Sequence, residues 1–356
     1  MTTRLMRPCF RHLDEVRRRR IPATPPGDLR LHRLERPEPW LAELEQEMRS
    51  AVRDPQQYPD YASFSDEVAR FVGVAPGNMV LGLGIEGLVR DLMMLCLDPG
   101  DTVAFVWPTC AMFGVYAQVF GARTSRIVFE PGQVPTVDDV VRHVRRGETR
   151  LVLLANPGQP VDYAMEPEEI AMVAHRCRAV GAVLAVDEAY FGFGAPTFLD
   201  DVYAHDNVVV LRTFSKALGG AGLRIGMAVG SGPVIRALEA VRASGEVAGP
   251  SMAMARVIMA RMADVVVPSV RAIIGGRDWV RGQLDAYGLV ARGRWANHVL
   301  VRLADPMRVA TRLRTRGVHV RADMPEPLQG HMLVTCGSVE TMRRFDVEFR
   351  RALMDG

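Results

Sequence analysis

From the first long predicted helix to about residue 240, the sequence alternates short β-rich runs with longer amphipathic stretches. The β-rich runs are NMVLGLG, DTVAFVW, RLVLLANP, VLAVDEAY and NVVVLRTFS. Strands that alternate with helices indicate βαβ units, whose strands form a mostly parallel sheet covered by helices on both faces. We therefore predict an α/β fold. Ligands of such sheets bind at the carboxyl ends of the strands, so the residues that follow each strand are the candidate functional residues.

The pattern divides the chain into successive predicted regions. Residues 1–40 are rich in proline and arginine and are interpreted as an N-terminal arm before a first helix at 40–52. Residues 41–240 hold the alternating pattern and form the predicted large domain. Residues 241–356 combine helical segments with fewer strands, HVLVRL and HMLVTCGS, which is typical of a separate, smaller α+β domain.

Charge and cysteine content exclude several classes of partner. A net charge of +3 over 356 residues is too small to indicate nucleic acid, and the arginines at 17–20 fit a solvated helix face. Five scattered cysteines without a CxxC pair favour reduced thiols in the cytoplasm, with no metal site.

The N-terminus has no signal-peptide pattern. The uncharged run 103–122 is broken by Pro108, which predicts a buried strand, a turn and a buried helix, and no membrane partner.

Only one of the 44 basic Lys and Arg residues is a lysine, Lys216. Arginine stays protonated under ordinary conditions, whereas a lysine amine can lose its proton and attack a carbonyl. A genome biased toward arginine could also leave a single surface lysine by chance. The neighbouring residues have to distinguish these two interpretations.

Polar side chains follow several of the predicted strands. Burying such groups without partners costs about 1 to 3 kcal/mol each, so we expect them to converge on a polar ligand in a crevice. Together with Arg224 they supply an amine, a carboxylate, a phenol, an amide, a hydroxyl and a guanidinium, a set that fits pyridoxal phosphate. The residues that follow the strands are Asn156, Asp187, Tyr190, Ser215 and Lys216.

Each of these groups has a predicted role. Lys216 forms a Schiff base with the cofactor aldehyde, and a nearby cation and partial burial lower its pKa. Asp187 keeps the pyridine nitrogen protonated, so that the ring can accept electrons. The remaining roles go to Tyr190 and Asn156 as donors to the ring oxygen, and to Ser215 and Arg224 as phosphate ligands.

These motifs resemble those of fold-type I pyridoxal-phosphate enzymes of the class I/II aminotransferase family, and are most similar to histidinol-phosphate aminotransferases. RTFSKALGGAGLRIG (212–226) is similar to the lysine motif of the family, and VDEAYFGFG to its Asp and Tyr motif. The resemblance implies a large domain with a mostly parallel sheet between helices and a smaller α+β C-terminal domain. It also implies a homodimer with shared active sites, in which Tyr58 of YPDY reaches the cofactor phosphate of the partner subunit.

GLGIEG (82–87) matches the GxGxxG pattern between a predicted strand and a predicted helix. The match raises an NAD-dependent dehydrogenase as an alternative. The acidic residue required at the end of a later strand is missing, because Asp98 and Asp101 lie in a turn. In the aminotransferase interpretation, the Gly84 and Ile85 amides face the cofactor phosphate at a helix N-terminus. A non-catalytic binding module is another alternative, and the complete set of polar groups argues against it.

Three features depart from the family. Cys110 follows PT, where the family has an aromatic residue that stacks on the pyridine ring. The loop LANPGQP is one residue shorter than the usual Asn-Asn-Pro-Thr-Gly loop. Leu333 in GHMLVTCGS stands where the family has an arginine that binds an anionic group of the substrate. Arg321, twelve residues upstream, is similar to a second anion-binding arginine and is the candidate replacement.

We therefore predict an aminotransferase-like enzyme that acts on an amino acid or related amine in a specialised biosynthetic pathway. Amino transfer is the leading reaction. Decarboxylation, β- or γ-elimination and bond formation stay open, because the same cofactor supports them and the altered substrate arginine affects which bond reacts.

Overall fold

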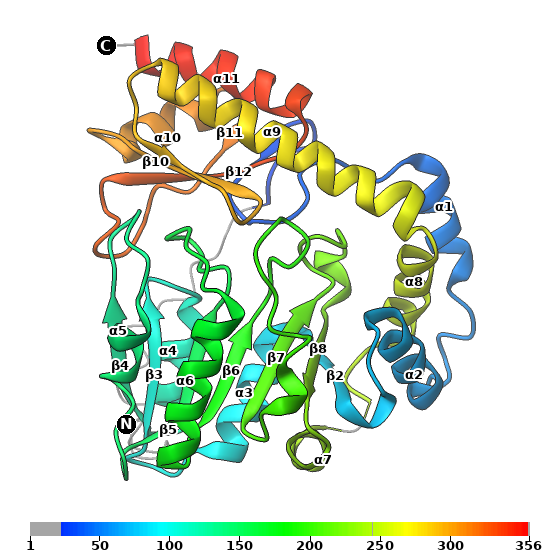
Figure 1. Cartoon of the computed structure of the whole chain (residues 1–356). Coiled ribbons are helices and arrows are strands. Elements are labelled where there is room, and N and C mark those ends of the chain that lie inside the picture. Colours follow the sequence, from blue (N-terminus) through cyan, green and yellow to red (C-terminus); the bar gives the residue numbers. More distant parts are fainter. Residues whose placement is uncertain (1–22, 244, 355–356) are drawn as a thin grey trace, which may run out of the picture.

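A seven-stranded sheet forms the centre of the larger part of the molecule (Figure 1). The computed structural model describes residues 23–243 and 245–354. The strand order is β2-β8-β7-β6-β5-β3-β4, and only β8 runs antiparallel to its neighbours. The strands are β2 (Met79–Leu83), β3 (Thr102–Trp107), β4 (Arg123–Val128), β5 (Thr149–Ala155), β6 (Val183–Asp187), β7 (Val208–Thr213) and β8 (Ile225–Gly230).

Helices cover both faces of this sheet, because its strands carry apolar side chains at successive positions. Leu151 and Leu153 of β5 pack in the cluster that includes α3, α4 and α7, whereas Val152 and Leu154 pack in the cluster that includes α6. Successive side chains of a strand point to opposite faces, so one strand supplies both cores. The helices are α1 (Ala42–Ala51), α2 (Tyr61–Val72), α3 (Gly84–Cys96), α4 (Ala111–Val119), α5 (Val137–Val141), α6 (Pro167–Val180), α7 (Gly232–Val241) and α8 (Gly249–Ala260).

The C-terminal part has a three-stranded sheet in the order β12-β10-β9, flanked by helices (Figure 1). A short parallel pair, β1 (Leu29–Arg30) with β11 (Val318–His319), joins the N-terminal segment to this part. The elements are α9 (Val267–Ala286), β9 (Ala291–Arg292), β10 (His298–Arg302), α10 (Pro306–Thr315), β12 (His331–Thr335) and α11 (Val339–Met354).

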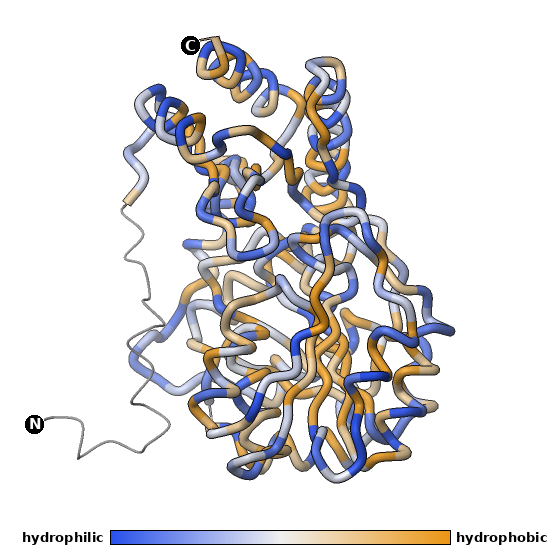
Figure 2. The backbone as a smooth tube through the Cα atoms, turned by 90° about the vertical axis from the view of Figure 1, so that its left-hand side faces the viewer, coloured by the Kyte–Doolittle hydropathy of each residue, from blue (hydrophilic) through white to orange (hydrophobic). Residues whose placement is uncertain are grey.

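The predicted fold class is confirmed: a mostly parallel α/β sheet is followed by a smaller α+β region. Figure 2 shows the apolar residues concentrated on the central strands. The predicted domain limits at 40 and 240 stay a prediction, although residues 29–30 of the predicted arm pair with β11. The arginines at 17–20 and Cys9 lie outside the described residues.

The uncharged run 103–122 forms β3, a turn and α4, as predicted. Within the described ranges, no helix has the length and apolar character needed to cross a membrane. The same ranges hold no group of three or more His, Cys, Asp or Glu side chains placed to bind a metal ion.

Candidate active site

A cavity of about 400 Å³ lies where β6 and β7 end, opposite the segment 321–325 of the C-terminal part. The carboxyl ends of parallel strands meet at one edge of the sheet, and this brings together residues that are far apart in sequence. The predicted site residues that line the cavity are Ile85, Cys110, Asp187, Tyr190, Ser215, Lys216, Arg224 and Arg321.

Lys216 lies in the turn between β7 and β8, with its amine enclosed by the cavity walls. The Nζ atom donates a hydrogen bond of 2.8 Å to the carbonyl of Leu34 and lies 5.4 Å from the centre of the Tyr190 ring. Burial lowers the pKa of this amine to about 8, although the nearby acidic groups, Asp187 among them, act to raise it. About a tenth of the amine is therefore neutral at pH 7, and this fraction can act as a nucleophile or base.

Asp187 is the last residue of β6, and its side chain is buried. The backbone N–H of Ala189 donates to Oδ1 at 3.0 Å, and Oδ2 makes no hydrogen bond with any described residue. Burial raises the pKa of Asp187 to about 6, against the opposing effects of the Ala189 hydrogen bond and of Lys216. A buried carboxylate with one oxygen unpaired is suited to a cationic partner.

One wall of the cavity is suited to bind an anion. Ile85 lies in the first turn of α3, where backbone N–H groups have no partner within the helix. The Nη1 atom of Arg224 lies 3.5 Å from Ser215 Oγ. Gly226 permits this arrangement, because a Cβ atom there would lie 2.7 Å from the backbone nitrogen of Ile85. Gly84 does not line the cavity, but a Cβ atom on it would lie 3.0 Å from the guanidinium of Arg224.

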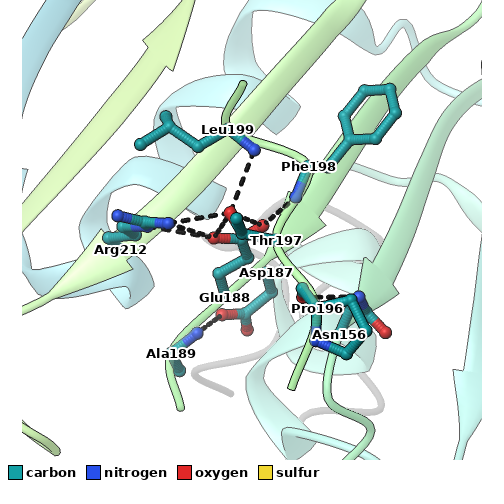
Figure 3. A network of polar contacts seen from close by, with 9 residues as sticks. All are labelled: Asn156, Asp187, Glu188, Ala189, Pro196, Thr197, Phe198, Leu199 and Arg212. Carbon is teal, nitrogen blue, oxygen red and sulfur yellow. Dashed lines mark hydrogen bonds and ion pairs between the residues drawn. The ribbon is translucent and has the colours of Figure 1, made fainter. Parts of the chain in front are cut away.

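Tyr190 is buried and lies in the turn after β6. A polar network around Glu188, two residues before it, holds this turn (Figure 3). The buried carboxylate of Glu188 forms an ion pair of 2.8 Å with Arg212, whose side chain is 13% exposed. Thr197 Oγ1 donates to Glu188 at 2.9 Å, and the Phe198 N–H donates to it at 2.7 Å. The network links the segment after β6 to β7, and it thereby fixes the backbone that carries Asp187 and Tyr190. Glu188 was not among the predicted site residues, although an acidic residue directly after a strand-end aspartate was a visible signal.

Asn156 differs from its predicted role. Its amide nitrogen donates to the carbonyls of Met165 and Pro196 at 3.1 and 3.4 Å, and its oxygen accepts from the Met165 N–H at 2.8 Å. The side chain is fully buried and does not line the cavity. The expectation of a ring-oxygen donor is therefore corrected: the backbone of the following loop satisfies this strand-end amide.

Two further predicted residues lie in contrasting places. The side chain of Tyr58 is 96% exposed and away from the cavity, so its predicted contact with a partner subunit stays a prediction. Cys110 lines the cavity just before α4. Phe113, which could have replaced the missing aromatic residue, packs edge-to-face on Phe105 at 6.1 Å between ring centres.

Arg321 and Leu333 are direct neighbours across an antiparallel bridge. The Arg321 N–H donates to the Leu333 carbonyl at 3.1 Å, and the Leu333 N–H donates back at 2.7 Å. Leu333 is fully buried, and Arg321 lines the cavity with its side chain partly exposed. The position that lacks the family's arginine is thus next to one that has an arginine.

Other residues at or beside the site carried no clear sequence signal. Leu34, Gln159 and Met324 also line the cavity. His298, which is not among the predicted site residues, is fully buried with its ring centre 6.1 Å from that of the Tyr190 ring. Burial lowers the pKa of His298 to about 4, so the ring is neutral at physiological pH.

Comparisons with known proteins agree with this geometry. Residues 28–345 match the family described as aminotransferase class I and II. The chain is 29% identical over 308 residues to a histidinol-phosphate aminotransferase of Thermoanaerobacter sp. (strain X514), covering 86% of each protein. It is 29% identical over 329 residues to an aromatic amino acid aminotransferase of Streptomyces coelicolor, covering 90% of each.

A solved structure of similar fold is the histidinol-phosphate aminotransferase of Sinorhizobium meliloti in complex with pyridoxal-5'-phosphate. Its TM-score is 0.83 at 22% sequence identity, over 91% of this chain and 90% of that one. The family match spans most of the chain and leaves no ground for the dehydrogenase alternative. The chain therefore belongs to the class I and II aminotransferase family.

Proposed function

We propose that this protein is a pyridoxal-phosphate-dependent aminotransferase that uses Lys216 as its reactive amine and acts on an amino acid or related amine. The observation that carries the proposal is the pairing, across one cavity, of an amine whose pKa is about 8 with a buried carboxylate that has an unpaired oxygen. Burial is unfavourable for both charged groups, and the cofactor offers a partner to each.

The residues present fit the cofactor. Asp187 offers its unpaired oxygen to a cationic ring nitrogen, and the α3 N-terminus with Arg224 and Ser215 offers donors to a phosphate. When bound, the cofactor supplies an electron sink next to the substrate amine. Lys216 would bind the aldehyde and afterwards hold or release a proton at Nζ, which its lowered pKa allows near neutral pH.

Arg321 is the proposed binding group for an anionic part of the substrate. It lines the cavity and pairs with Leu333 in an isolated antiparallel bridge. A substrate anion can therefore pair with Arg321 in place of the arginine that is missing at position 333. The cavity also has apolar wall residues, Met324 and Pro325, next to Arg321. We infer a substrate that pairs one anionic group with an apolar surface.

A homodimer with shared sites is part of the proposal. The exposed Tyr58 supports it, because a tyrosine with almost its whole side chain in solvent is available to a second subunit. A cytoplasmic location is proposed from the cysteines: Cys96, Cys110, Cys177 and Cys336 are all free thiols.

Borohydride reduction of the purified protein tests the proposal. A yellow protein that bleaches and carries the reduced adduct on the peptide containing Lys216 is expected, and Lys216→Arg is the matched control that keeps the charge but loses the nucleophile. A colourless wild-type protein that gains no absorbance from added pyridoxal phosphate would refute the proposal. Screening amino donors for conversion to the pyridoxamine form then tests amino transfer itself; products without that conversion would favour another pyridoxal reaction.

A further inference from the structure

Residues 29–38, here called the strap, cross from the C-terminal part to the cavity and are anchored along their length. At one end, the Leu29 and Leu31 N–H groups donate to residues of the β11 segment at 2.8 Å each. At the other end, the carboxylate of Glu38 accepts hydrogen bonds of 2.6 Å from the Ser338 N–H and the Thr341 hydroxyl. The strap is therefore a fixed part of the C-terminal region and not a free arm.

Leu34, in the middle of the strap, has an unusual backbone conformation. Its φ is +57°, in the left-handed region that is unfavourable for a residue with a Cβ atom. Two side chains hold it there: the Leu34 N–H donates to Thr335 Oγ1 at 2.9 Å, and Asn297 Nδ2 donates to the Leu34 carbonyl at 3.2 Å. Thr335 and Asn297 are both buried. Strain that is maintained by buried polar groups is often associated with a functional site.

The left-handed conformation of Leu34 directs its carbonyl oxygen toward the amine of Lys216. Its oxygen accepts the hydrogen bond of 2.8 Å from Lys216 Nζ, and Leu34 itself lines the cavity. A lysine side chain has four rotatable bonds, so an amine without a partner would occupy many positions. The charged and titratable groups that influence this amine are Cys110, Glu35, Asp187 and Arg224, and none of them is hydrogen-bonded to it.

We propose that the strap closes the active site over Lys216, with the Leu34 carbonyl as the acceptor that positions the amine whenever the amine is not bonded to the cofactor. Thr335 and Asn297 are positioning residues that act through the Leu34 backbone. The proposal rests on the proposed function only in taking Lys216 as the reactive amine. Because both a neutral amine and an ammonium group have N–H donors, the carbonyl can hold Nζ in either protonation state.

The test is the rate at which a small acylating reagent modifies Lys216 in the cofactor-free protein at constant pH. As the only lysine, Lys216 gives one modified peptide besides the N-terminal amine, which serves as an internal reference. Thr335→Val removes the acceptor of the Leu34 N–H with little change of shape, and is expected to increase the rate about 5- to 150-fold. Thr335→Ser keeps the hydroxyl and is expected to leave the rate within about threefold of wild type.

Cys177, fully buried on α6, distinguishes local opening from general loss of stability. The proposal expects the reactivity of Cys177 toward a thiol reagent to be unchanged in Thr335→Val. Equal increases at Lys216 and Cys177, or no increase at Lys216, would overturn it. Leu34→Pro provides a second variant, because proline can adopt neither the positive φ nor the N–H hydrogen bond, and it is expected to give the same local increase. The borohydride experiment is independent of these rates, so failure of the strap proposal and failure of the proposed function are distinguishable.

Discussion

The Asp187→Asn variant is expected to be more stable than wild type at pH 8 when neither protein holds the cofactor. With the cofactor bound to both, the variant is expected to be the less stable of the two. Asp187 is 8% exposed, and its carboxylate has a single hydrogen bond, from the Ala189 N–H to Oδ1. Asparagine has the same shape and also offers Oδ1 as an acceptor. The substitution therefore removes the charge and leaves that hydrogen bond in place.

The size and pH dependence of the effect follow from the pKa. Burial raises the pKa of Asp187 from 3.8 to about 6, which corresponds to about 3 kcal/mol against ionisation in the folded chain. The folded chain binds this proton more tightly than the unfolded chain, so wild-type stability falls as the pH rises from about 4 to about 6. Asparagine does not titrate. The advantage of Asp187→Asn is thus expected to grow across this range and to reach about 3 kcal/mol above pH 7.

Urea unfolding of both cofactor-free proteins at pH 4.5 and pH 8 measures this difference. Repeating the measurement with saturating pyridoxal phosphate is expected to reverse the order, because the cofactor gives the carboxylate a cationic partner that asparagine cannot match. A variant that is less stable than wild type at pH 8, or whose advantage is the same at both pH values, would contradict the idea that Asp187 is buried at a cost to stability in order to bind the cofactor.

Three further outcomes are expected. The rate of acylation of Lys216 in the cofactor-free protein should rise with pH, with a midpoint near pH 8, because burial favours the neutral amine. A midpoint near pH 10.5 would show instead that the amine is exposed to water. Glu188→Gln should lower the free energy of unfolding by about 3 kcal/mol, the lower end for breaking a buried pair, since the partly buried Arg212 loses its counter-ion. A loss below about 1 kcal/mol would mean that the pair is hydrated. Arg321→Leu should raise KM for a carboxylate-bearing donor by about 30-fold or more, but not for the matching amine without the carboxylate; equal effects on both would remove Arg321 from the substrate site.

The positions of Asp187, Ser215 and Lys216 were predictable for a physical reason. They lie at or just after the ends of strands in one sheet, and parallel strands bring their carboxyl ends to the same edge whatever the details of packing. The role of Asn156 was not predictable in this way, because a loop backbone can satisfy a buried amide as well as a ligand can. Sequence position alone does not distinguish these two partners.

Other parts of the site had no sequence signature. Leu34 takes part through its carbonyl, a group that every residue has, so nothing in its side chain could have revealed the contact with Lys216. His298 was an isolated histidine in an apolar strand, and only the packing of β10 against the turn after β6 places its ring beside Tyr190.

The α/β architecture and the chemical groups at the strand ends follow from the order of residues, because both depend on local periodicity and on residue type. Which backbone atoms face those groups depends on how the whole chain packs. Three features illustrate this: the left-handed conformation of Leu34, the bridge between Arg321 and Leu333, and the hydrogen bonds of the Asn156 side chain to its own loop. Each depends on hydrogen bonds that form only when segments separated in the sequence have packed together. Each of these contacts has on at least one side a backbone group that all residues share, and for that reason the order of side chains alone could not predict them.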